Sequence, residues 1–337
     1  MWRELTAFPA ALQRRRIESI DVLRCVSVLY IVAFWHLGNY ISNASYQNAI
    51  TTHLTVGALA LFFLISGYMV SPAKKVSGLE SGGTFRFLAE RFIRIYPPYL
   101  VASIFFLILN LESIGVFIRS VFLISMFAKP APMTLWFITA LIICYCTVPV
   151  LAKFRRDTIL YVFVCFSFMV SGYLYNFATG RLDVRLLIYF PSFAAGVFMA
   201  GRVLSTGAAL PIAVGVGTLA ALVLSTRSDF TELETDLRAT PFALFFASLV
   251  FAVTVTRVRA VKFATLFRYV AYASFFMYLG HRIVFLVVKY IYFPEAPAMQ
   301  IVYMLAAVVF LIFPLSFAAQ CGYDNVVGVL NARRCRT

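Results

Sequence analysis

The sequence predicts an all-α membrane protein, a polytopic helical bundle with about ten transmembrane helices and both termini in the cytoplasm. Hydrophobic residues make up 62% of the chain and charged residues only 13%, and the mean hydropathy is +0.89. A soluble domain needs a larger polar fraction to cover its surface. The apolar residues also gather in runs of span length, separated by short polar loops. Composition and patterning therefore indicate the same fold class.

Each apolar run is a candidate span, because about 20 apolar residues cross a bilayer as a helix. The runs cover residues 22–40, 54–70, 97–111, 133–152, 158–178, 186–201, 203–226, 239–256, 269–288 and 298–320. A further run, 114–128, is short and contains Arg119, so we expect an interfacial or re-entrant segment there. We expect a single membrane domain over 1–337, with a short cytoplasmic N-terminal segment 1–20 and a C-terminal tail 321–337.

The net charge of +15 favours anchoring at a membrane over nucleic-acid binding, because the basic residues occupy short loops between spans. If the N-terminus lies inside, most of the loop lysines and arginines are cytoplasmic, as the positive-inside rule requires. The basic residues left outside are Arg119, Lys129, Arg181, Arg185, Arg227 and Arg238. The expected partners are therefore membrane lipids and no nucleic acid.

Ionisable side chains inside a span are costly and mark candidate functional sites. The first span holds Arg24 and, about 18 Å further along a helix, His36. Histidine is the side chain best suited to exchange a proton near neutral pH. The alternative is a structural histidine satisfied at the interface beside Trp35. His53, in contrast, falls in an expected outside loop, where we expect it to be solvated.

The ninth expected span carries the adjacent residues His281 and Arg282. Paired ionisable groups at this depth must face the bundle interior or a water-filled cavity. A structural hydrogen bond between helices is the alternative role.

The expected loop 71–96 ends in Arg86, Glu90, Arg91 and Arg94. If this segment is helical, Arg91 and Arg94 share a face and can bind a polyanion. Glu90 can instead pair with the arginines four residues away on either side, which describes a self-neutralised surface helix. The sequence contains no Gly-rich phosphate loop, no metal-ligand cluster and no Ser nucleophile elbow, so we expect no metal.

Five short motifs follow one another along nearly the whole chain. They are Asp21-Val-Leu-Arg24 through Trp35-His36, Phe62-Phe-Leu-Ile-Ser66-Gly67-Tyr68, Arg91-Phe-Ile-Arg94-Ile-Tyr-Pro97, Leu135-Trp136-Phe-Ile-Thr-Ala-Leu141 and Met277-Tyr-Leu-Gly-His281. In order and spacing these motifs resemble the membrane acyltransferase 3 family, bacterial integral-membrane enzymes that O-acylate cell-surface glycans. The expected ten spans agree with that resemblance.

The resemblance implies an O-acyltransferase of the cell inner membrane. Its donor is acetyl-CoA or another acyl-CoA on the cytoplasmic side, and its acceptor is a hydroxyl of a polysaccharide or lipid-linked saccharide. By this resemblance His36 is the catalytic histidine and Arg24 its partner, while Arg91, Arg94 and Arg86 are candidates for binding the donor, whose phosphates suit arginine. Candidates for substrate binding or a structural role are Ser66, Trp136, His281 and Arg282.

Two features depart from the family pattern. The acidic residue that some members carry shortly after the Leu-Trp motif is absent, which leaves the acceptor type open. The family places ten residues between the arginine and the histidine, whereas this chain has eleven. Because a helix turns about 100° per residue, Arg24 and His36 would lie about 120° apart on a regular helix. We therefore predict a π-bulge or kink within 26–35, or an Arg24 that precedes the regular helix.

Two other functions explain part of the sequence. A transporter or flippase would use Arg24, His36, His281 and Arg282 as a proton relay or substrate site. A non-catalytic scaffold would explain the topology but not the buried charges.

Overall fold

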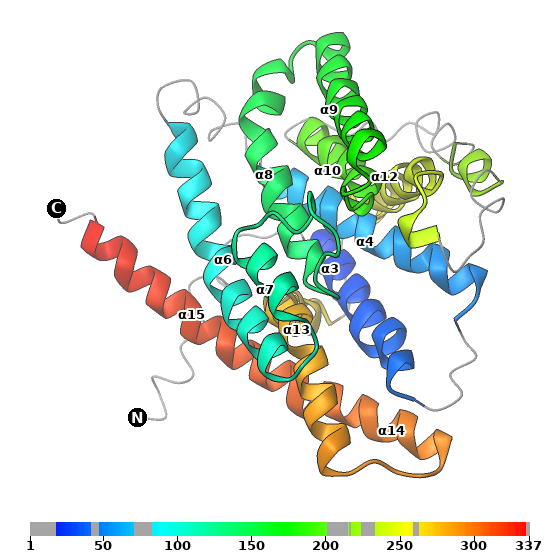
Figure 1. The fold of residues 1–337 in the computed structure, drawn as a ribbon, viewed down its shortest axis with the longest axis vertical. Helices are drawn as coiled ribbons and strands as arrows, with labels where there is room; N and C mark the ends of the chain where they lie inside the picture. The colour runs from blue at the N-terminus through cyan, green and yellow to red at the C-terminus, as the bar shows by residue number, and fades with distance from the viewer. Residues whose placement is uncertain are drawn as a thin grey trace. The chain divides into compact units, whose positions relative to one another are not determined.

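The computed structural model describes residues 18–41, 47–70, 83–200, 215, 217–223, 233–258 and 263–334. Every regular element in these ranges is a helix, which confirms the all-α class (Figure 1). The chain divides into two compact units, one formed by Met1–Asn43 with Arg257–Thr337 and the other by Ala44–Thr256.

Eight helices of the described residues are long and apolar enough to cross a membrane. They coincide with eight of the expected spans. The run 186–201 appears as a shorter apolar helix, Arg185–Met199, and most of the run 203–226 lies outside the described residues. The chain is therefore a multi-pass membrane protein, while the count of about ten spans and the orientation of the termini stay predictions.

The first unit begins with α3 (Glu18–Tyr30), which continues into a π-helical turn, η1 (Ile31–Trp35), and a 3₁₀ turn, η2 (His36–Asn39). The long helix α13 (Ala264–Ile291) packs against α3 on one side and α15 (Phe313–Arg334) on another. Between them lie α14 (Pro297–Ala307) and a second π turn, η5 (Val308–Ile312). The helix continues to Arg334, through the expected tail.

The second π turn has a local cause in the sequence. Pro314 lies two residues after the end of η5, and a proline inside a helix removes one backbone donor and crowds the carbonyl four residues earlier, which is that of Phe310 in η5. A π turn at that point opens the backbone and relieves the clash. Helices α14 and α15 therefore form one continuous rod, orange to red in Figure 1.

The second unit contains the remaining helices. In chain order they are α4 (Ala49–Val70), α6 (Gly83–Ile108), α7 (Ile114–Val121), α8 (Trp136–Phe154), α9 (Thr158–Thr179), α10 (Arg185–Met199), a helical stretch over 217–223, the 3₁₀ turn η4 (Leu233–Thr235) and α12 (Ala239–Arg257). The short α7 agrees with the prediction that 114–128 does not span. Its position at an interface stays a prediction.

Two glycines bring α4 and α10 into direct backbone contact. A Cβ atom at Gly67 would collide with the carbonyl oxygen of Phe193, and one at Gly196 would collide with that of Leu64. Small residues at such crossings let transmembrane helices approach closely, because lipid supplies no hydrophobic force to press them together. The glycine of the Ser66-Gly67 motif is therefore explained by packing.

The segment expected as the loop 71–96 is helical from Gly83 onward, so the loop prediction is wrong for that part. Residues 71–82 lie outside the described ranges. The apolar run that suggested the span begins only at Pro97, because the preceding turns intersperse Arg86, Arg91 and Arg94 with apolar residues such as Phe87. A helix with charges interspersed in this way is missed when only continuous apolar runs are counted.

Candidate active site

The first span contains the predicted irregularity. The π turn Ile31–Trp35 lies within 26–35, and the backbone N–H of His36 donates to the carbonyl of Ile31, five residues earlier. Arg24 lies inside the regular helix α3, so the alternative that it precedes the helix is wrong. A π turn absorbs one extra residue, which compensates for the longer spacing between Arg24 and His36.

Both side chains consequently face the same helix, α13. The guanidinium of Arg24 donates to the hydroxyl of Ser274 at 3.1 Å, and a nitrogen of His36 lies 2.8 Å from one of His281. Ser274 and His281 are about two helical turns apart on one face of α13. The structure therefore brings Arg24 and His36 to a common inward stripe, as predicted.

A hydrogen bond between ring nitrogens joins the two imidazoles. Nδ1 of His36 lies 2.8 Å from Nε2 of His281, the ring planes differ by 7°, and the ring centroids are 4.8 Å apart. Parallel rings with adjacent nitrogens but distant centroids must lie edge to edge, not face to face. This is the direction in which a ring nitrogen donates or accepts.

His281 is the better shielded of the two histidines. It is fully buried, whereas His36 is partly exposed. Nδ1 of His281 lies 2.9 Å from the carbonyl oxygen of Tyr278 and 3.2 Å from that of Met277. The ring of His281 is therefore held by its own helix on one edge and contacts His36 on the other.

Arg282 is buried beside this pair. Its backbone carbonyl accepts a hydrogen bond from the hydroxyl of Tyr40 at 3.5 Å, and its Nε has no hydrogen-bond partner among the described residues. A buried guanidinium nitrogen without a partner is costly. Because arginine is always protonated in proteins, Arg282 places a positive charge next to His281.

The arginines of α6 have separate environments. Arg86 forms an exposed ion pair with Glu90 at 3.1 Å, so the self-neutralised helix is realised for this pair. The guanidinium of Arg91 lies over the rings of Phe87 and Tyr145, 5.7 Å and 5.9 Å from their centroids. Arg94 is exposed. Helix α6 therefore presents Arg91 held by aromatic rings and Arg94 open to the surroundings.

The acyltransferase 3 model, described as an acyltransferase domain, matches residues 17–319. The chain belongs to the acyltransferase 3 family. No curated protein and no solved structure matches it. Because the match covers most of the chain, including both helices of the His36–His281 contact, the protein is a multi-pass membrane acyltransferase.

The Leu-Trp motif of this acyltransferase is buried in the second unit. Trp136 begins α8, and the guanidinium of Arg185 lies 4.3 Å from the centroid of its ring. Arg185 also donates to both carboxylate oxygens of Asp183, at 2.8 Å and 2.5 Å. Trp136 therefore anchors an ion pair, which favours its structural role. Ser66, the other candidate on α4, is partly exposed.

The structure corrects the prediction for His53 and adds Ser274 to the site. His53 is not in a solvated loop, because it is buried in α4 with Nδ1 2.6 Å from the carbonyl of Ala49 and its ring edge-on to Phe242. Ser274 was not identified from the sequence. A serine is a common small residue in membrane helices, and only the contact with Arg24 distinguishes this one.

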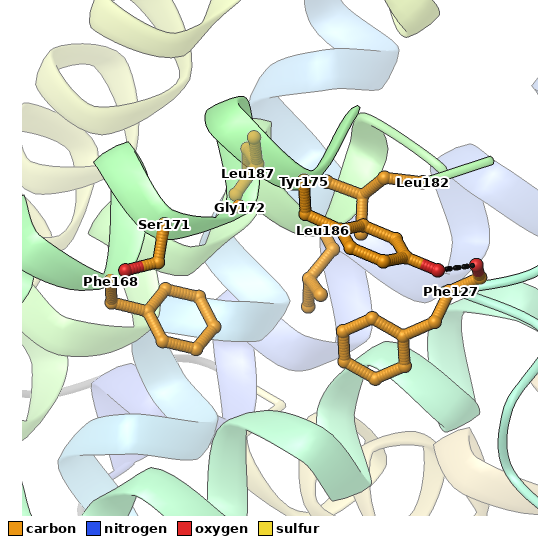
Figure 2. A pocket seen from close by; sticks show the side chains of 8 residues that line it. All are labelled: Phe127, Phe168, Ser171, Gly172, Tyr175, Leu182, Leu186 and Leu187. Carbon is orange, nitrogen blue, oxygen red and sulfur yellow. Dashed lines mark hydrogen bonds between the residues drawn. The ribbon is translucent and has the colours of Figure 1, made fainter. Parts of the chain in front are cut away.

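An apolar pocket of about 210 Å³ lies in the second unit beside α9 and α10. Its lining includes Phe168, Leu186 and Leu187, and the hydroxyl of Tyr175 donates to the carbonyl of Phe127 at 2.9 Å (Figure 2). The lining residues include no histidine, carboxylate or amine. Histidine is the commonest general acid or base, and the hydroxyl of Tyr175 is already bound to a carbonyl, so the histidine pair of the first unit is the better candidate.

Proposed function

We propose that this acyltransferase moves an acyl group, with acetyl as the expected one, from acyl-CoA on the cytoplasmic side to a hydroxyl of a polysaccharide or lipid-linked saccharide. The observation that carries the proposal is the partly exposed His36, held by a fully buried second histidine inside a membrane span. The acyltransferase 3 match supplies the reaction class. The expected location is the cell inner membrane.

In the proposed reaction His36 acts as the general base. It removes the proton of the acceptor hydroxyl as the oxygen attacks the thioester carbonyl, and the carbon–sulfur bond then breaks. The resulting imidazolium returns the proton to the departing thiolate, so that His36 ends each cycle neutral. General-base catalysis of this kind contributes about 10²–10⁴-fold to a rate.

Arg24 is proposed to assist from the same stripe of the helix. Its guanidinium donates to the hydroxyl of Ser274 at 3.1 Å, on the same helix, α13, that holds His281. The two side chains are separated along the helix axis, so that Arg24 can contact a part of the substrates away from the reacting atoms. Arg24 would then bind negative charge while His36 handles the proton.

Arg91 and Arg94 are proposed to bind the phosphates of acyl-CoA. The aromatic rings around Arg91 hold its guanidinium in place, and preorganised arginines bind phosphate with little loss of conformational entropy. Arg86 is expected to contribute less, because Glu90 already neutralises it.

Isotope-labelled acetyl-CoA supplied to inside-out vesicles tests the proposal. We expect label on glycan or lipid-linked saccharide in vesicles with the wild-type protein and none in vesicles without it. A transporter or flippase is the alternative, supported by the polar contact between two spans. Saccharide transport without any transfer of label would favour that alternative and contradict the proposed reaction.

A further inference from the structure

The hydrogen bonds of His281 determine which nitrogen of His36 is available for chemistry. We propose that His281 is a positioning residue that holds the proton of His36 on Nδ1 and so leaves Nε2 as the base. This inference rests on the proposed function for its catalytic meaning. The location of the proton, however, follows from the hydrogen bonds alone and can be measured without activity.

Nδ1 of His281 faces two hydrogen-bond acceptors. This nitrogen lies within hydrogen-bond distance of the carbonyl oxygens of Tyr278 and Met277, at 2.9 Å and 3.2 Å. A carbonyl oxygen can only accept. Nδ1 of His281 must therefore carry a hydrogen, because an unprotonated nitrogen would place its lone pair against two acceptors in a buried site.

The other ring nitrogen of His281, Nε2, carries no proton. A second proton on Nε2 would create an imidazolium that is completely buried and adjacent to the cationic Arg282. An uncompensated buried charge is strongly unfavourable, and a like charge beside it adds to the cost. His281 is therefore neutral, and its Nε2 is a hydrogen-bond acceptor.

The protonation of His281 determines the tautomer of His36. Because Nε2 of His281 accepts, Nδ1 of His36, 2.8 Å away, must donate. The two rings are nearly parallel and meet at their edges, which is compatible with a hydrogen bond between their nitrogens. A neutral His36 then has no hydrogen on Nε2, for which no partner is found in the described part of the chain.

Nε2 of His36 is therefore the nitrogen that can take a proton, and His281 stays neutral when it does. The hydrogen bond at one nitrogen of an imidazole fixes the state of the other. When Nε2 of His36 takes a proton, Nδ1 still donates to His281, so that the neutral acceptor stabilises the imidazolium and holds its ring in place. The two carbonyls of α13 complete this chain of hydrogen bonds.

Ring-¹⁵N-labelled histidine tests the assignment, because the whole chain contains only three histidines. Nitrogen chemical shifts distinguish the two neutral tautomers, and the signals can be assigned with His36→Ala and His53→Gln. In the wild-type protein we expect the proton of His36 on Nδ1. A His36 that carries its proton on Nε2 would overturn the proposal, whether or not acyl transfer has been observed.

Two variants of His281 connect the tautomer to the reaction. His281→Gln keeps an acceptor near the position of Nε2, whereas His281→Leu removes it. We expect His281→Leu to lose the Nδ1–H form of His36. It should also lower kcat by about 10- to 100-fold, the scale known for the orienting partners of metal-bound histidines, with little change in KM. His281→Gln should recover part of both.

Gly280→Ala is the matched control on the neighbouring residue, because a methyl group there meets no atom within 4 Å. Wild-type kcat in a folded His281→Leu variant would contradict the positioning role. If His281→Leu does not fold, the positioning role is tested by the tautomer of His36 in the wild-type protein and by kcat of His281→Gln. Failure of the wild-type protein to transfer label would refute the proposed function but not the proton assignment.

Discussion

Two helix pairs of this protein are held together by opposite means. In the second unit, α4 and α10 are regular helices whose backbones meet at Gly67 and Gly196. In the first unit, α3 and α13 meet through Arg24–Ser274 and His36–His281. The α3 side of this contact is interrupted by a π turn and a 3₁₀ turn.

The difference between the two contacts indicates that one serves packing and the other the reaction. Small residues suffice to pack helices in lipid, and they require no irregular backbone. Polar side chains and a π turn are costly there, and such features concentrate at functional sites. We therefore infer that the α4–α10 contact maintains the fold and the α3–α13 contact carries the reaction.

Removal of the proposed base should separate activity from stability most clearly. His36→Ala is expected to lower acyl transfer by about 10²–10⁴-fold while the purified protein keeps its thermal unfolding temperature within a few degrees. The matched control is His53→Ala, which removes a buried imidazole from α4. That variant should lose stability but retain transfer per folded molecule. Full activity in well-folded His36→Ala would show that His36 is not the general base.

The glycine contact should show the reverse pattern. Gly67→Ala inserts a methyl group against the backbone carbonyl of Phe193, and overpacking of this kind costs about 1–3 kcal/mol or more. We expect a lower unfolding temperature and poor recovery of the protein. Gly280→Ala on α13, where the added methyl has free space, should unfold at or above the wild-type temperature. Equal behaviour of the two variants would show that α4–α10 packing does not depend on glycine.

The arginines of the regular helix α6 should affect binding rather than chemistry. Loss of a charge-assisted contact costs about 1.5–3 kcal/mol, so Arg91→Ala and Arg94→Ala should each raise KM for acyl-CoA by about tenfold or more, with a smaller change in kcat. Arg86→Ala serves as the control because Arg86 is paired with Glu90. An unchanged KM in both variants would leave α6 as a surface helix only.

Glu112 should affect stability alone, in a pH-dependent way. Neither carboxylate oxygen has a hydrogen-bond partner among the described residues, and burial raises the pKa of Glu112 to about 7. The folded state thus holds this proton more tightly than the unfolded state, so its contribution to stability is complete at low pH and is lost as pH rises toward and through 7.

The corresponding variant is Glu112→Gln. Its unfolding temperature should match that of the wild type near pH 4 and exceed it increasingly up to about pH 8, by a few degrees. Acyl transfer at one pH, normalised to folded protein, should not change. A temperature difference that is independent of pH would contradict the buried, ionisable state of Glu112.

The sequence predicted those features that depend on composition and local spacing. The all-α class and the eight recovered spans follow from apolar runs, and the π turn follows from the residue count between Arg24 and His36. The helical start of α6 at Gly83, the burial of His53 and the partner role of Ser274 were not predicted. Each of these depends on which neighbouring helix covers a face, and local patterning contains no information about that neighbour.

The central claim is that His36 and His281 act as one catalytic unit in the α3–α13 contact. The most direct test compares transfer of labelled acetyl groups by His36→Ala, His281→Leu and the double variant. Residues that act as a unit have non-additive effects. We predict that the double variant is no slower than His36→Ala alone, because a positioning residue has no effect once the base is gone. A double variant slowed by the product of the two single losses would show that the histidines act separately and would contradict the claim.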